Sequence, residues 1–220
     1  MTHKHEAALG DLAEAIRLQP EEPQAYLIRA DIELGLERWQ AAVDDTRRAL
    51  FLAPGDPGAH FAVALALAAA GRQTEAAAAF GRAIELRPGE QAYHYNLALT
   101  LSDLGEHQHA LDSFGRALGI GPPAAEIYTN RGLVHGAMGN WDRALRDHQS
   151  ALDLDPEYYA ARYNRACAQS MMGQSGTVLQ DLATVLAQEP SVRAHALTDS
   201  DLEWARRHVP GVRELLADRR

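Results

Sequence analysis

The chain has 220 residues, of which 46% are hydrophobic and 6% aromatic, and it carries a formal net charge of −9 at pH 7. This acidic balance argues against nucleic-acid binding, because a phosphate backbone attracts basic surfaces. The longest apolar run, residues 61–70, is about half as long as a membrane-spanning helix, and Cys167 is the only cysteine, which excludes an internal disulfide. We therefore expect no membrane insertion and a cytoplasmic location.

Proline recurs at intervals of 34 residues from residue 20 to residue 190. The recurring prolines are Pro20, Pro54, Pro88, Pro122, Pro156 and Pro190. Alanine recurs five and twelve places before successive prolines, and alanine or glycine recurs ten places after them, as expected where two helices approach closely. Glycine marks the turn between those helices, because it accepts a positive φ. The turn glycines are Gly71, Gly105, Gly139 and Gly173. The sequence therefore predicts a tandem array of helical hairpins.

The motif within each interval points to a known family. The interval over residues 91–122 carries the motif as His94, Ala98, Ala110, Phe114, Ala117 and Pro122. The interval over residues 125–156 carries it as Tyr128, Gly132, Trp141, Ala144, Ala151 and Pro156. This pattern resembles the tetratricopeptide repeat family over roughly residues 1–190. The resemblance implies an all-α fold, a right-handed α-α superhelix whose first helices line a concave groove.

Residues 1–20 contain only the second helix of a repeat, with Ala8, Leu12 and Ala15 at its packing places. The sequence leaves open whether Met1 is the native start or the array is longer. In both cases an apolar strip at this end lacks its covering helix. We expect a partner, a second copy of the chain or a local rearrangement to cover it, so self-association through this half repeat is one expectation.

Five full repeats follow. They span residues 23–54, 57–88, 91–122, 125–156 and 159–190. In the first of them Glu37 stands where the others have the turn glycine, which predicts a distorted turn. In the last, Val178 and Val185 stand where the others have alanine. Larger side chains there predict a second helix that is shifted outward or has a different neighbour.

The interval stops after Pro190, and residues 191–220 predict two short helices, 201–208 and 212–217. Ser200 or Asp199 is the expected N-cap of the first. The segment resembles the closing segment of many bacterial tetratricopeptide proteins. We expect it to form a C-terminal helical cap on the last repeat, covering it with Leu202, Trp204 or Ala205, Leu215 and Leu216.

No catalytic or metal-binding constellation emerges from the sequence. Ser175 lies between Gly173 and Gly176, but no strand precedes it, so the turn between two helices is the better interpretation than a nucleophile elbow. His107 and His109 lack a third ligand and are expected at a solvated helix start. We predict a protein that is not an enzyme and has no cofactor and no metal.

Other polar residues are expected to have structural places. His60, His94 and His148 occupy aromatic packing places and are predicted to be core or half-buried rings. A charged run on a second helix is predicted to lie on a solvated convex face; it consists of Asp44, Asp45, Arg47 and Arg48.

The resemblance implies that particular places on the first helices face the groove. Place five carries Phe61, Tyr95 and Tyr163, and place nine carries Leu65, Leu99 and Leu133. Place six carries a ladder of amides that could hold an extended peptide backbone, namely Asn96, Asn130 and Asn164. The alternative is that asparagine is simply common at this place in the family. Arg131 and Arg165 stand one place further and are expected to flank the ladder.

We therefore predict a scaffold or adaptor that binds a segment of another protein in its groove. The segment is expected to be neutral or basic with apolar anchors, and to bind extended or as an amphipathic helix. One alternative is a regulatory or substrate-recruiting module of a larger enzyme or enzyme complex. A second alternative, RNA binding by a pentatricopeptide array, is disfavoured by the 34-residue period and the acidic balance.

Overall fold

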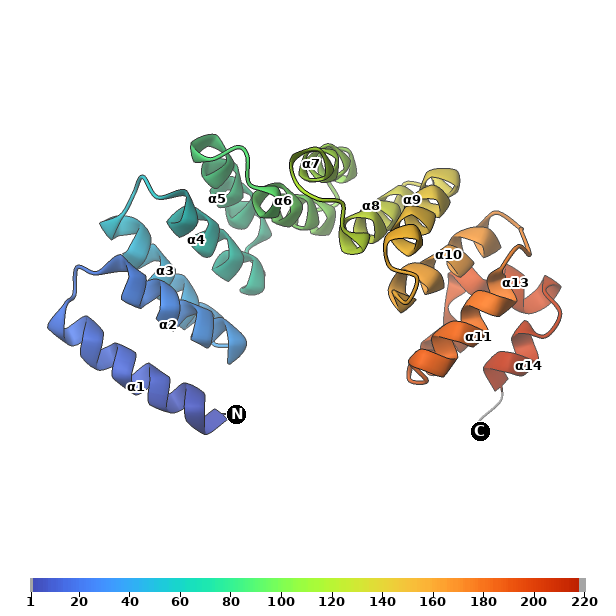
Figure 1. Cartoon of the computed structure of the whole chain (residues 1–220), viewed down its shortest axis with the longest axis horizontal. Helices are drawn as coiled ribbons and strands as arrows, with labels where there is room; N and C mark the ends of the chain where they lie inside the picture. The colour runs from blue at the N-terminus through green and yellow to red at the C-terminus, as the bar shows by residue number, and fades with distance from the viewer. Residues whose placement is uncertain (1, 218–220) are drawn as a thin grey trace. The chain divides into compact units, whose positions relative to one another are not determined.

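The structure, a computed structural model, describes residues 2–217. All regular secondary structure in that range is helical, which confirms the predicted all-α class (Figure 1). Contacts divide the chain into two compact units, Met1–Gly121 and Pro122–Arg220.

The first unit consists of one single helix and three helical hairpins. Its helices are α1 (Thr2–Leu18), α2 (Pro23–Gly35), α3 (Trp39–Leu52), α4 (Pro57–Ala69), α5 (Gln73–Leu86), α6 (Gln91–Asp103) and α7 (His107–Ile120). Ala15 of α1 is exposed, whereas Ala49, at the equivalent place of α3, is fully buried. The reason is that α3 packs on α2 as the other half of its hairpin, while α1 lacks such a partner among residues 2–217.

The second unit contains two hairpins and a C-terminal helical segment. Its helices are α8 (Ala125–Ala137), α9 (Trp141–Leu154), α10 (Tyr159–Met171), α11 (Val178–Gln188), α12 (Val192–Thr198), the 3-10 turn η1 (Ser200–Leu202), α13 (Glu203–His208) and α14 (Val212–Ala217). The sequence did not predict α12, and it predicted one helix where η1 and α13 follow each other. The Asp199 side chain caps η1 by accepting a hydrogen bond from the amide of Asp201.

The turn inside each hairpin repeats the same backbone geometry. Gly71 has φ 75°, and the amide of Arg72 donates to the carbonyl of Leu67 at 2.9 Å. Glu37 adopts φ 58°, and the amide of the residue after it, Arg38, donates to a helix carbonyl at 2.8 Å. The prediction of a distorted turn at Glu37 is therefore wrong. The exposed Glu37 adopts a left-handed conformation that is unfavourable for a side chain other than glycine, and the backbone hydrogen bonds of the turn accompany it.

The fourth residue of a repeat ties its first helix to the proline before it. The Tyr26 hydroxyl donates to the carbonyl of Pro20 at 3.1 Å, and Nε2 of His94 lies 3.0 Å from the carbonyl oxygen of Pro88. Arg162 donates to the Pro156 carbonyl in the same way. His94 is buried and His60 half-buried, as predicted from their places. Tyrosine, histidine and arginine can therefore all occupy this position, because each is long enough to donate a hydrogen bond to the proline carbonyl.

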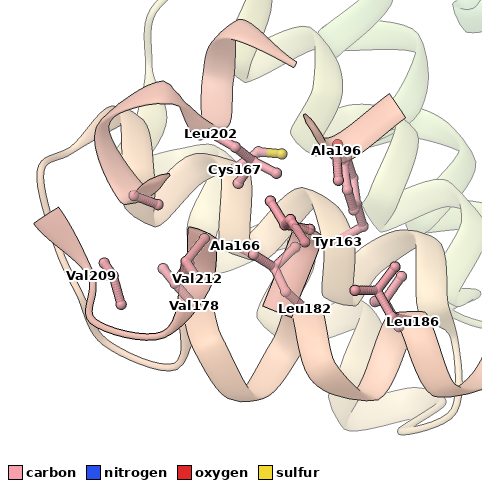
Figure 2. Packing of buried hydrophobic residues seen from close by; sticks show 13 residues of the cluster. Tyr163, Ala166, Cys167, Val178, Leu182, Leu186, Ala196, Leu202, Val209 and Val212 are labelled. Atoms are coloured by element: carbon pink, nitrogen blue, oxygen red, sulfur yellow. The ribbon is translucent and has the colours of Figure 1, made fainter. Parts of the chain in front are cut away.

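A hydrophobic cluster joins the last hairpin to the C-terminal segment (Figure 2). Leu182 of α11 is fully buried there together with Leu202 of η1 and Leu216 of α14. Val178 and Val185 are also fully buried in this cluster. Their larger side chains face the C-terminal helices, so the last second helix has a different neighbour, one of the two outcomes that the sequence predicted.

Candidate functional site

The second unit contains an open cavity of about 490 Å³. Helix α8 contributes Gly132, Leu133, Gly136 and Ala137 to its wall, α9 contributes Trp141, Ala144 and His148, and α10 contributes Tyr163, Asn164 and Cys167. The C-terminal segment completes the wall with His195, Asp199 and Asp201. Two first helices, one second helix and a non-repeating segment therefore build one site.

Two glycines of α8 let aromatic rings of α9 lie against its backbone. A Cβ atom added to Gly132 would lie 2.6 Å from Cε1 of His148. A Cβ atom added to Gly136 would lie 2.9 Å from Cζ3 of Trp141. Both distances are shorter than a van der Waals contact between two carbon atoms. The two rings therefore occupy the space that side chains at these positions would fill.

The close approach at Gly132 predicts the effect of a larger residue. Gly132→Leu should lower the free energy of unfolding by about 1–3 kcal/mol, because the leucine must displace the buried His148 ring. Urea unfolding followed by circular dichroism measures the change. Gly119→Leu is the matched control, since a Cβ atom at this helical glycine of α7 meets no atom within 4 Å. Equal stability of the two variants would contradict the packing at Gly132.

Asp199 is the centre of the polar contacts in the cavity. Its Oδ2 atom accepts a hydrogen bond from the Tyr163 hydroxyl at 2.6 Å and lies 3.5 Å from Nε2 of His195. The Cys167 Sγ atom lies 3.7 Å from the same oxygen. Burial and the hydrogen bond to Asp199 raise the pKa of Tyr163, which remains a neutral donor. Burial and the neighbouring Asp199 carboxylate raise the pKa of Cys167, so its sulfur stays a thiol and not a nucleophilic thiolate.

His148 is a buried and neutral part of the wall. Its side chain is 2% exposed, and burial lowers the pKa of its imidazole to about 4. Within residues 2–217 the buried Nδ1 atom has no hydrogen-bond partner. The described residues also contain no cluster of three metal-ligating side chains. The site therefore offers hydrogen bonds, carboxylates and ring faces for binding.

The structure brings together three of the residues that were predicted to line the groove. Leu133, Tyr163 and Asn164 all line the cavity, and Leu133 is 48% exposed. Asn130 lies half-buried on α8, outside this wall. Tyr163 is 8% exposed and belongs to the hydrophobic cluster of Figure 2 as well as to the cavity.

Five further selected residues lie in the first unit, namely Phe61, Leu65, Tyr95, Asn96 and Leu99. The Phe61 ring stacks on Tyr93 with centroids 4.7 Å apart, and the Tyr95 ring lies 6.1 Å from that of Phe114. The Asn96 amide donates to the carbonyl of Ala92, one turn earlier in its own helix, at 2.8 Å. Leu65 packs against the core of the first unit, and Leu99 is half-buried.

Arg131 and Arg165 are bound to acidic residues of the neighbouring second helix. Arg131 donates to both carboxylate oxygens of Asp147, at 2.8 and 2.6 Å. Arg165 makes the same bidentate pair with Asp181, at 2.9 and 2.6 Å. These contacts hold the two helices of a hairpin together.

The same pair joins Arg29 to Asp45 in the first unit. The prediction that Asp45 lies on a solvated convex face is therefore wrong, since it is only 6% exposed. The signal was present in the sequence as an arginine followed by an aspartate 16 residues later, in three of the repeats.

The cavity residues that were not predicted for binding include Trp141, His195, Asp199 and Asp201. Two closely spaced acids in the non-repeating segment, Asp199 and Asp201, were the available signal. Concerning membranes, no helix within residues 2–217 is long and apolar enough to cross a bilayer.

Comparisons with known proteins agree with the repeat architecture. Profiles described as tetratricopeptide repeat match residues 2–57, 58–125 and 125–158. No curated protein matches the sequence. Among solved structures, MamA 41-end from Desulfovibrio magneticus RS-1 is similar at 20% identity, covering 77% of this chain and 96% of that chain with a TM-score of 0.70.

Two further structures have the same fold. YrrB, described as a TPR protein with an unusual peptide-binding site, is 20% identical over 84% of this chain and 97% of that chain, with a TM-score of 0.66. TTC0263, a thermophilic TPR protein from Thermus thermophilus, is 23% identical over 76% of this chain and 91% of that chain, with a TM-score of 0.62. With its hairpins, its turn geometry and profiles that match more than half of its length, this chain belongs to the tetratricopeptide repeat family.

Proposed function

We propose that this protein is a non-enzymatic interaction module and that the cavity between α8, α9 and α10 binds a segment of another protein. The observation that carries the proposal is the open cavity itself, which combines a half-exposed Leu133 with the Asn164 amide on two successive first helices. Exposed apolar surface anchors a side chain of the segment, and an amide can donate to and accept from its backbone.

The chemistry of the cavity supports binding over catalysis. The Cys167 thiol is protonated and buried, and the His148 imidazole is held neutral with its pKa near 4, far below the range of an effective general base. Family membership points the same way, because tetratricopeptide arrays are protein-interaction modules. A scaffold, or a recruiting module of a larger assembly, would use the same cavity in the same way.

The test is a selection of random peptides displayed on phage against the purified protein, followed by affinity measurements on the selected peptides. Leu133→Gln should weaken their binding by about tenfold, since it removes apolar contact area in the cavity. Leu154→Gln is the matched control, because Leu154 of α9 has a similar exposure of 46% and lies outside the cavity wall. Asn164→Ala should weaken binding by about 0.5–1.5 kcal/mol for the lost hydrogen bond. Selected peptides that bind all variants equally would refute the proposed site.

A further inference from the structure

The carboxylates of the cavity have no lysine or arginine beside them in the wall, where the neighbouring basic side chain is His195, with Nε2 3.5 Å from Asp199 Oδ2. The two carboxylates are those of Asp199 and Asp201. Within residues 2–217 the Asp201 side chain forms no ion pair, and the Arg206 guanidinium donates to the backbone carbonyls of Ala196 and Asp199. Burial and the neighbouring Asp199 charge raise the pKa of Asp201, as expected for two like charges held close together.

This arrangement contrasts with the other buried acids of the second unit. Asp147 and Asp181 are each paired with an arginine in bidentate geometry. The chain therefore pairs with arginine the acids that hold its helices together. Of the two acids that face the cavity, Asp199 has hydrogen bonds and the His195 ring but no arginine, and Asp201 forms no ion pair within residues 2–217. A cationic group inside the cavity would relieve the repulsion between Asp199 and Asp201.

His148 provides a second observation, a buried polar atom without a partner in a ring of the cavity wall. Its ring is 2% exposed and forms part of the wall, yet its buried Nδ1 atom lacks a hydrogen-bond partner among the described residues. A buried polar atom without a partner is costly, so such atoms are usually satisfied. Because the imidazole is neutral, it can accept a hydrogen bond without repelling a cation.

We propose that the cavity receives an arginine side chain of the bound segment, held by Asp199 and Asp201. This inference rests on the proposed function and names the chemistry of the partner. A guanidinium carries five N–H donors in one plane, enough for two carboxylates and the His148 ring together. It also stacks on aromatic faces, which Trp141 and Tyr163 provide in the wall. A lysine ammonium has three donors on one atom and does not stack.

The cavity volume of about 490 Å³ is compatible with this occupant. It falls within the range of roughly 300–1,000 Å³ that is typical of ligand sites. Leu133, half-exposed at the same cavity, offers apolar contact to the residues beside the arginine. The expected partner motif is therefore an arginine with an apolar neighbour.

The experiment uses peptides selected by the wild-type protein from a random display library. The selected sequences should be enriched in arginine. In each of them, exchange of that arginine for neutral citrulline should weaken binding by at least about tenfold, and exchange for lysine by less. Asp201→Asn should cause the same loss for the arginine peptide and no further loss for the citrulline peptide. Asp142→Asn, which removes an exposed charge of α9 outside the cavity wall, is the control and should have no effect.

The possible results separate the two proposals. Peptides that depend on Leu133 but contain no enriched arginine, or that bind Asp201→Asn as tightly as the wild type, overturn the arginine site and leave the proposed function intact. A selection that enriches no peptide overturns both. Circular dichroism spectra and melting midpoints of Asp201→Asn should match the wild type, because its side chain makes no hydrogen bond within residues 2–217.

Discussion

Replacing Asp181 with alanine is expected to lower the free energy of unfolding by about 3–5 kcal/mol. Asp181 is fully buried, accepts two hydrogen bonds from Arg165 and a third, at 2.6 Å, from the Thr177 hydroxyl. Arg162 approaches it as well, with Nη1 3.5 Å from Oδ1. The substitution leaves these cations in the protein interior without their counter-charge, which costs more than the lost hydrogen bonds alone.

Urea unfolding of the purified variant measures this effect. Asp153→Ala is the matched control, because Asp153 is an exposed aspartate of α9 that accepts one hydrogen bond from Gln149. It should change stability by no more than about 0.5 kcal/mol. Combining Asp181→Leu with Arg165→Met should restore much of the loss, since an apolar pair avoids desolvating two charges. A loss of stability as small as that of Asp153→Ala would contradict the buried ion pair.

His148 is expected to make the protein about 3 kcal/mol less stable at pH 4 than at pH 7. Burial lowers the pKa of its imidazole to about 4 in the folded protein, whereas an unfolded chain has the ordinary value near 6.5. Between these two values the unfolded state binds a proton that the folded state does not bind. The free energy of unfolding therefore falls as the pH decreases from about 6.5 to about 4, and this contribution is constant above pH 7.

The chain itself suggests the matched variant. Phe80 and Phe114 occupy the place of His148 in two other repeats, and both are buried. His148→Phe keeps a ring of similar size and removes the titration, so its stability should depend less on pH by about 3 kcal/mol between pH 7 and pH 4. Urea unfolding at several pH values provides the comparison. Parallel pH profiles for wild type and variant would contradict the lowered pKa of His148 in the folded protein.

The repeat architecture could be predicted because its determinants recur. Ala64 and Ala98 are fully buried at the small place after each proline, and Gly132 is buried at the equivalent place. The turn at Gly71 has the predicted positive φ. Each of these features depends on contacts within a hairpin or with the next one, so the same residue type appears every 34 residues and reveals the contact. The prediction at Glu37 was wrong because the turn keeps its backbone hydrogen bonds and its positive φ even with a residue that does not favour them.

The cavity could be predicted only in part. Leu133, Tyr163 and Asn164 were selected because they occupy fixed places on first helices. Asp199 could not be predicted, because it lies in the C-terminal segment, which has no repeat pattern. Its position beside Tyr163, 36 positions earlier, depends on how the chain folds back there. Likewise, the residue type alone does not tell whether an arginine is free to bind a ligand. The bidentate pair with Asp147 shows that the Arg131 guanidinium has a structural role.

The sequence by itself determined the family, the helical hairpins and the buried small residues, because periodic contacts between neighbours leave a periodic record. Only the tertiary structure decided which polar groups are satisfied and which face a cavity. Asp181 and Asp201 are both acids near the end of the array, yet the first lies in a buried ion pair and the second in the wall of an open cavity. That difference arises from the way η1 and α13 fold back onto α10, and charge, burial and hydrogen bonding at each atom follow from it.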